Sequence, residues 1–149
     1  MNTNQPCRAA AAQVSGGSDN PGLMGTVEFR EVFGGVQVTA RITGLPQNES
    51  GFFALHVHEG GDCGGEAFTE TGGHYNPGMM EHPHHAGDLP PLLSCGGRAF
   101  LSVLTDRFAV RDVVGRTIVI HDGADDFRTQ PAGNSGAKIA CGVIRCVMR

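Results

Sequence analysis

The chain has 149 residues, a formal net charge of −4 with histidine neutral, and no cluster of Lys and Arg. This length suits one domain with its own core, and the charge balance argues against a nucleic-acid-binding protein. No apolar stretch approaches the roughly 20 residues that a membrane-spanning helix needs. We therefore expect a single domain over residues 1–149 with neither a nucleic-acid nor a membrane partner.

The N-terminal stretch MNTNQPCRAAAAQVSG lacks a basic segment followed by a continuous apolar segment, so we see no secretory signal. Such a start is compatible with a protein that stays in the cytoplasm, and equally with an exported protein whose leader was removed. The sequence leaves the compartment open.

The first part of the chain predicts three strands. Residues 8–14 are short and apolar, and after a turn-rich segment residues 23–32 alternate between apolar and polar, as in a half-buried strand. Gly34 and Gly35 predict a hairpin turn, and the next run, GVQVTARITGL, alternates again. We expect this run to turn five side chains inward: Val36, Val38, Ala40, Ile42 and Leu45.

The second part predicts more strands separated by two long loops. The expected strands are GFFALHVH (51–58), residues 97–104, residues 115–121 and the closing run KIACGVIRCVM (138–148). Residues 59–96 and 122–137 show no clear period, and loops of this length in a compact domain are usually functional. Glycine is abundant, at 23 residues, and no stretch has a helical period. An antiparallel all-β sandwich or barrel is therefore the expected fold class.

The histidines are concentrated in one region. All seven lie between His56 and His121, and six of them lie within residues 56–88. Neutral imidazole is the commonest protein ligand for copper and zinc, although a His-rich surface loop can also bind adventitious metal. His56 and His58 are two residues apart at the end of a predicted strand, so both imidazoles can face one ion. Other ligand-type residues follow along the loop and after the next apolar run: His74, His82, His85, Asp88 and His121.

The chain has five cysteines, so at least one is unpaired if all pairing is internal: Cys7, Cys63, Cys95, Cys141 and Cys146. None has zinc-finger spacing. From their number alone, several could be small buried apolar residues.

Four segments together resemble the copper/zinc superoxide dismutases, over about Arg8 to Val147. They are GFFALHVHEGGDC, GGHYNPGMMEHPHHAGDLP, VGRTIVIHDGADD and GNSGAKIACGVI, in the order found in that family. The resemblance implies an eight-stranded antiparallel Greek-key β-barrel, which is an immunoglobulin-like sandwich, with two long functional loops.

The resemblance also implies two metal sites. Copper would be bound by His56, His58, His74 and His121, and zinc by His74, His82, His85 and Asp88. The imidazole of His74 would then bridge both ions. Four neutral imidazoles suit both oxidation states of copper, and three nitrogens with one carboxylate make a closed set for zinc. His84 matches no ligand position and is expected to be a solvated loop residue.

Two further assignments follow from the resemblance, one for Asp125 and one for a pair of cysteines. Asp125 would link the copper ligand His56 to the zinc ligand His82, whereas from composition alone it could be an exposed loop acid, as we expect for Asp122 and Asp126. Cys63 and Cys141 would form a disulfide that ties the metal loop to the last strand. The remaining cysteines have no counterpart, and we expect them to be buried or free thiols: Cys7, Cys95 and Cys146.

Six glycines are expected to serve turns and close backbone approaches: Gly72, Gly73, Gly87, Gly133, Gly136 and Gly142.

The implied activity is dismutation of superoxide to dioxygen and hydrogen peroxide by redox cycling of copper. Zinc would have a structural and electrostatic role, and His74 would leave copper and take a proton on reduction. The family commonly has an arginine three residues before the closing cysteine, where this chain has Lys138. Lysine keeps the charge but loses the rigid guanidinium fork, so we expect Lys138 to guide the anion less well, with Arg128 as a second, weaker candidate. The resemblance leaves a homodimer open.

Two other functions are weighed against this one. A non-catalytic relative that stores or delivers copper or zinc, or uses metal only for stability, should lack one or more copper histidines, and none is missing here. A metal-assisted hydrolase would need an open zinc position and a general base, whereas Asp88 completes the zinc set.

Overall fold

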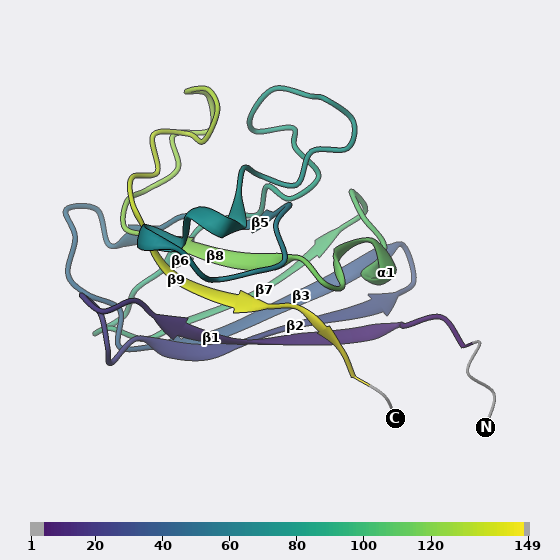
Figure 1. The fold of residues 1–149 in the computed structure, drawn as a ribbon, viewed down its shortest axis with the longest axis horizontal. Helices are drawn as coiled ribbons and strands as arrows, with labels where there is room; N and C mark the ends of the chain where they lie inside the picture. Colours follow the sequence, from purple (N-terminus) through teal and green to yellow (C-terminus); the bar gives the residue numbers. More distant parts are fainter. Residues whose placement is uncertain (1–4, 148–149) are drawn as a thin grey trace.

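The computed structural model describes residues 5–147 and shows one curled, antiparallel sheet. The sheet order is β5-β8-β9-β1-β2-β3-β7. The strands span Ala9–Gly16 (β1), Met24–Val32 (β2), Gly35–Thr43 (β3), Leu55–His58 (β5), Ala99–Thr105 (β7), Thr117–His121 (β8) and Lys138–Val143 (β9). Curling lays β5, β8 and β9 over β1, β2 and β3 (Figure 1). The buried apolar side chains of these strands form one core between the two layers.

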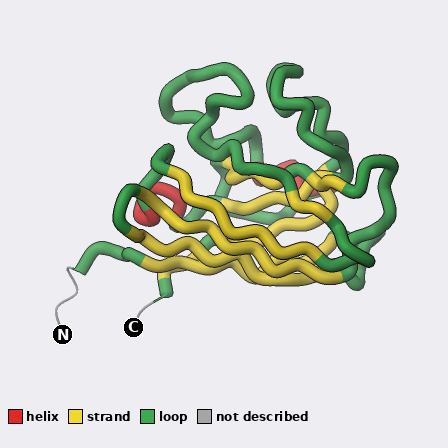
Figure 2. Tube along the Cα trace, turned by 180° about the vertical axis from the view of Figure 1, so that it is seen from behind, coloured by secondary structure: helices red, strands yellow, loops and turns green. Residues whose placement is uncertain are grey.

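A short second pair of strands lies where the two edges of the sheet meet. β4 (Phe52–Phe53) pairs with β6 (Leu92–Leu93), and a bridge between Cys95 and Arg98 leads from β6 into β7. Because β4 also continues almost directly into β5, this pair connects both edges. The predicted antiparallel Greek-key β-barrel is thereby confirmed as the fold class. Two long loops rise from one end of it, side by side (Figure 2).

The alternating pattern of β3 determines which of its side chains enter the core. All five residues predicted to face inward are buried: Val36, Val38, Ala40, Ile42 and Leu45. Full burial of an aliphatic side chain contributes on the order of 1.5–3 kcal/mol, so this register strongly resists a one-residue slip. The hairpin turn between β2 and β3 uses Phe33 and Gly34, and Gly34 has φ 91°, a conformation that suits glycine.

Two segments predicted as single strands are each divided in the structure. GFFALHVH is divided at Ala54 into β4 and β5, because β4 pairs with β6 whereas β5 pairs with β8. The closing run is divided into β9 and β10 (Arg145–Cys146), because β9 pairs with both β8 and β1 whereas β10 pairs with β1 alone. Met148 at the end of that run lies outside the described residues.

Short helices occur where the sequence predicted none. The first long loop contains a 3₁₀ helix, η1 (Glu66–Thr71), and the connection after β7 contains a single α-helical turn, α1 (Val110–Val113). Neither is long enough to produce a readable helical period. Among the described residues, no helix has the length and apolar character to cross a bilayer.

The two ends of the described chain are joined by a disulfide that the sequence prediction missed. Cys7 and Cys146 are bonded across a sequence separation of 139, so the expectation that they are buried or free thiols was wrong. The reason is the pairing of β10 with β1, which puts Ala10 opposite Cys146. Within residues 5–147, Cys95 is the free thiol, and it is exposed.

We expect the double variant Cys7→Ser/Cys146→Ser to unfold more easily than the wild type. The bond restricts the unfolded chain, and removing such a constraint typically costs about 2–4 kcal/mol. Urea unfolding of the oxidised, metal-free proteins measures the loss, with Cys95→Ser as the matched control that breaks no bond. Equal stability of the double variant and the control would show that this bond adds nothing to the fold.

Candidate metal centre

The sheet and the first long loop bring the histidines together. His56 and His58 lie on β5, and His121 ends β8, the strand that pairs with β5. The loop folds back on β5 through two isolated bridges, in which His74 lies opposite His58 and Asp88 lies opposite His56. All of these side chains are buried. Residues far apart in the sequence therefore share one small volume under the two loops.

Four imidazoles form the first cluster. The ring of His74 lies 4.0 Å from that of His56 and 4.9 Å from that of His58, measured between centroids. The ring of His121 lies 4.9 Å from that of His56. One ring nitrogen of each of the four lies within 4.8 Å of the others. Four nitrogen donors thus converge at one point.

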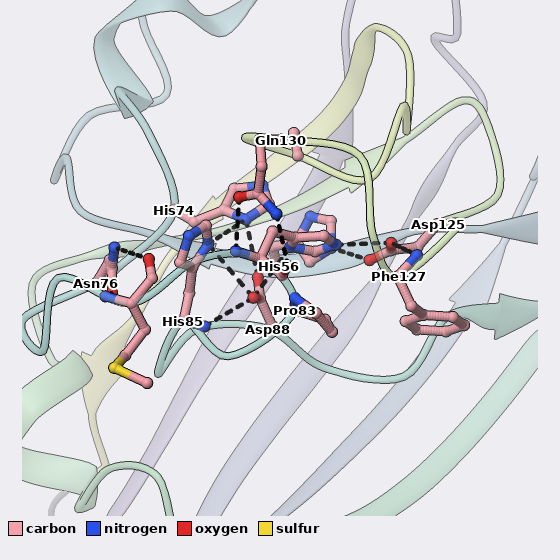
Figure 3. Close-up of polar contacts among 12 residues, drawn as sticks. His56, His74, Asn76, Pro83, His85, Asp88, Asp125, Phe127 and Gln130 are labelled. Carbon is pink, nitrogen blue, oxygen red and sulfur yellow. Dashed lines mark hydrogen bonds and ion pairs between the residues drawn. The ribbon is translucent and has the colours of Figure 1, made fainter.

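The second cluster shares His74 with the first. Its Nδ1 lies 2.8 Å from Asp88 Oδ1 and 3.2 Å from Nδ1 of His85 (Figure 3). Nδ1 of His82 lies 3.0 Å from the other oxygen of Asp88. Three nitrogens and one carboxylate therefore converge on the other side of the His74 ring, so this ring stands between the two clusters.

Asp125 orients one histidine of each cluster. Its Oδ2 lies 2.8 Å from Nε2 of His56, and its Oδ1 lies 2.7 Å from Nε2 of His82 (Figure 3). A carboxylate accepts hydrogen bonds, so both Nε2 atoms carry the proton and both Nδ1 atoms keep a free lone pair. Burial alone would raise the pKa of Asp125, but the hydrogen bonds from the two rings outweigh it and lower that pKa to about 2. Asp122 and Asp126, in contrast, are exposed.

Two backbone carbonyls orient two more rings. Nδ1 of His58 donates to the carbonyl of Gly72 at 2.8 Å, and Nδ1 of His121 lies 3.4 Å from the carbonyl of Gly136. With these protons on Nδ1, the Nε2 atoms of His58 and His121 present lone pairs to each other at 3.3 Å. Two facing lone pairs repel each other unless a cation lies between them.

Unpaired buried nitrogens give an independent test of whether metals fit. Among the described residues, three buried ring nitrogens make no hydrogen bond: Nδ1 of His56, Nε2 of His74 and Nδ1 of His82, which faces the Asp88 carboxylate at 3.0 Å without a proton to donate. Leaving such an atom unsatisfied costs on the order of 1–3 kcal/mol, which a bound cation would recover. The first two belong to the four-imidazole cluster and the third belongs to the mixed cluster, so the donor sets fit one cation each.

Burial keeps these imidazoles available as ligands. It lowers the pKa of His58 to about 2 and that of His121 to about 3, and it also lowers the pKa of His56 and of His85. Burial would raise the pKa of Asp88, but the hydrogen bond from His74 and the neighbouring rings outweigh it, so that pKa is lowered. At neutral pH His56, His58 and His121 are thus neutral nitrogen donors, and Asp88 adds one anionic oxygen to the second cluster.

Comparison with known proteins identifies the family. The family model for copper/zinc superoxide dismutase (SODC) matches residues 23–144. The chain belongs to the copper/zinc superoxide dismutase family. A relative from Aquifex aeolicus, "Superoxide dismutase [Cu-Zn] 2", is 36% identical over 138 residues, covering 83% of this chain and 80% of the relative.

Two other relatives extend the comparison. "Superoxide dismutase [Cu-Zn]" of Deinococcus radiodurans is 37% identical over 147 residues, covering 84% of this chain and 79% of the relative. "Superoxide dismutase-like protein YojM" of Bacillus subtilis is 36% identical over 106 residues, covering 60% of this chain and 54% of that protein.

Lys138, the predicted anion-guiding residue, lies at the edge of the four-imidazole cluster. It opens β9 opposite His121, and its Nζ donates to Thr71 Oγ1 at 2.7 Å and to the carbonyl of Gly72 at 3.0 Å. The same carbonyl accepts the hydrogen bond from His58. Burial lowers the pKa of Lys138. Its charge lies close enough to contribute to the lowered pKa values of His58 and His121.

The disulfide implied by the family resemblance is present in the structure. Cys63, at the start of the metal loop, is bonded to Cys141 of β9. Cys141 lies opposite Val119 of β8, so the loop is tied to the strand that runs beside β8, which His121 ends. His84 is exposed, as the sequence predicted.

Three residues that hold the site had no signal, or only a general one, in the sequence. Arg107 donates from Nη1 to the carbonyls of Pro83 and His85, at 2.7 and 3.2 Å. Gln130 binds the main chain of His82. Gly133 was expected only to serve a turn or a close approach. In the structure it has φ 71°, and an added Cβ would lie 2.0 Å from Asp125 Oδ1.

Proposed function

We propose that this chain converts two superoxide anions and two protons into dioxygen and hydrogen peroxide. The observation that carries the proposal is the position of the His74 ring, which belongs to both donor clusters and leaves its buried Nε2 without a partner. Membership of the copper/zinc superoxide dismutase family supports the same activity.

We assign the four-imidazole cluster to copper and the mixed cluster to zinc. Copper would be held by His56, His58, His74 and His121, and zinc by His74, His82, His85 and Asp88. Bound copper supplies a one-electron redox centre, and bound zinc supplies a fixed positive charge without redox chemistry. The chemistry of the two donor sets supports this division.

The protein's own groups hold the ligands and handle the proton. Asp125 and the carbonyls of Gly72 and Gly136 fix the tautomers of their imidazole partners, so the lone pairs stay directed inward through turnover. Nε2 of His74 is the ring atom that can hold and return a proton, because its Nδ1 is engaged on the zinc side with Asp88. The ring therefore combines a ligand and a proton carrier.

Lys138 gives an acidic protein a local attraction for an anion. The chain carries a formal charge of −4, so its overall field repels superoxide. The ammonium of Lys138 lies against Thr71 and Gly72, next to the His58 ligand, and a cation at such a site raises the local concentration of a small anion. We propose that Lys138 guides the substrate, with exposed Arg128 as a weaker contributor.

The alternative functions have less support. A storage or delivery protein that lacks catalysis should have lost a copper ligand, yet all four imidazoles converge here. A hydrolase would need an open position on zinc, whereas Asp88 lies within hydrogen-bonding distance of both His74 and His82. A single domain over residues 1–149, a homodimer, and the lack of nucleic-acid and membrane partners stay predictions.

The test is metal content and superoxide-dependent activity measured on the same sample of protein supplied with both metals. We expect about one copper and one zinc per chain, one for each donor set, and activity that disappears when copper is removed. Zinc alone, even after reconstitution with copper, would contradict the proposal and favour the binding protein.

Replacing Lys138 with Met should slow the reaction and flatten its dependence on salt. Removing one guiding cation is expected to reduce kcat/KM by roughly three- to tenfold at low ionic strength, and by less at high ionic strength. Lys138→Arg is the matched control, because it keeps the charge and should keep the salt slope. A slope in Lys138→Met equal to that of the wild type would mean that another group guides the anion.

A further inference from the structure

One side chain of the second loop holds both main-chain polar groups of a zinc-site histidine. Oε1 of Gln130 accepts a hydrogen bond from the backbone N–H of His82 at 2.8 Å, and its Nε2 donates to the backbone carbonyl of His82 at 2.7 Å (Figure 3). The same Nε2 lies 3.1 Å from the carbonyl of Arg128, within its own loop. One amide thus connects residues 122–137 to the main chain of the first loop.

His82 depends on the second loop in a way that its neighbours do not. Its ring is held by Asp125 and its main chain by Gln130, both within residues 122–137. Asp88, in contrast, is bonded within its own loop, where its Oδ2 accepts from the backbone N–H of His85. His82 is 3% exposed, so few waters can replace these contacts.

We infer that Gln130 is a positioning residue of the zinc site, which fixes the main chain of His82 so that Nδ1 of its ring faces Asp88. This inference rests on the zinc half of the proposed function. The hydrogen bond to Asp125 fixes the direction of Nε2 of the His82 ring. It does not fix the main chain of His82, which could still turn relative to the ring. The amide of Gln130 removes that freedom, because it contacts the backbone on both sides of the Cα atom.

An amide is the group that this role needs. It offers an acceptor to the N–H and a donor to the carbonyl at the same time. Glu at this position would keep the acceptor but bring a negative charge against the His82 carbonyl, and Leu would keep similar bulk with neither bond. We therefore expect the strength of zinc binding to follow the order Gln, Glu, Leu.

The experiment measures zinc affinity by chelator competition on copper-free protein, for wild type, Gln130→Glu and Gln130→Leu. Groups that hydrogen-bond to metal ligands without touching the metal typically change metal affinity by about 10–100-fold. Because Gln130 is exposed, we expect the lower end of this range, about a tenfold loss of zinc affinity for Gln130→Leu. Gln37→Leu is the matched control: Gln37 is an exposed amide on β3 that bonds Ser102, and its loss should leave zinc affinity unchanged.

A second readout separates positioning from general stability. Cobalt(II) bound in place of zinc has a visible absorption spectrum that reports ligand geometry, and Gln130→Leu should alter it while Gln37→Leu should not. Wild-type affinity and an unaltered cobalt spectrum in Gln130→Leu would overturn the inference, even if the variant melted earlier. A wild type that binds no zinc would instead overturn the zinc assignment itself. Should Gln130→Leu fail to fold, the same two measurements on Gln130→Glu decide.

Discussion

Replacing His121 with Ala should reduce the rate of superoxide dismutation by more than about 100-fold. Loss of a group that only hydrogen-bonds to a metal ligand typically lowers activity by about 10–100-fold, and loss of a ligand itself should lower it further. The side chain is 3% exposed, and its Nε2 faces that of His58 across 3.3 Å in the four-imidazole cluster. Three nitrogens would remain, and alanine fills none of the space that the ring leaves. Activity per chain, measured after reconstitution with both metals, gives the result.

Zinc binding should survive the same substitution. His121 is absent from the mixed cluster, and its nearest backbone partners are Ala54 and Gly136 rather than residues of the zinc loop. His84→Ala is the matched control, because His84 is exposed and belongs to neither cluster. Wild-type activity in His121→Ala would remove this residue from the copper set and, with it, the assignment of the first cluster.

Replacing Gly133 with Ala should disrupt the zinc site although Gly133 itself is not a ligand. A methyl group there would lie 2.0 Å from Asp125 Oδ1 and 2.7 Å from Nε2 of His82, where real contacts do not occur. Asp125 must therefore move, and it then releases the rings of both His56 and His82. Zinc affinity should fall by at least about tenfold, as for other losses of ligand-orienting groups.

The matched control separates this clash from backbone strain. Gly34 also has a left-handed backbone, with φ 91° against 71° for Gly133, but an added Cβ at Gly34 would meet no atom within 4 Å. Both alanine variants should lose about 1–2 kcal/mol of stability from the left-handed conformation. Only Gly133→Ala should also lose zinc, as chelator competition would show. Equal zinc affinity in the two variants would mean that Asp125 does not orient the site.

The sequence predicted the fold and the candidate ligands because both depend on local patterns. Alternation along β3 was enough to select its buried face, and the two-residue spacing of His56 and His58 placed both imidazoles on one side of β5. The family resemblance added the wider grouping with His74 and Asp88, which spacing within a loop cannot supply.

What the sequence could not predict depends on partners distant along the chain. The division of GFFALHVH at Ala54 follows from a change of pairing strand, which leaves no mark on hydrophobic alternation. The bond between Cys7 and Cys146 requires β10 to reach β1. Gln130 is an ordinary loop residue until its amide is placed against His82.

The bond between Cys7 and Cys146 also affects where opening of the molecule can start. Proteins commonly loosen first at their termini, where few contacts hold the chain. Here the segment before β1 is linked covalently to β10, the last strand of the chain, so neither can detach independently. The bond from Cys63 to β9 fixes the start of the first long loop, which leaves the rest of that loop and residues 122–137, held to each other through Asp125 and Gln130, without a covalent tie. When the protein is heated, bound metals should therefore be released before the barrel unfolds.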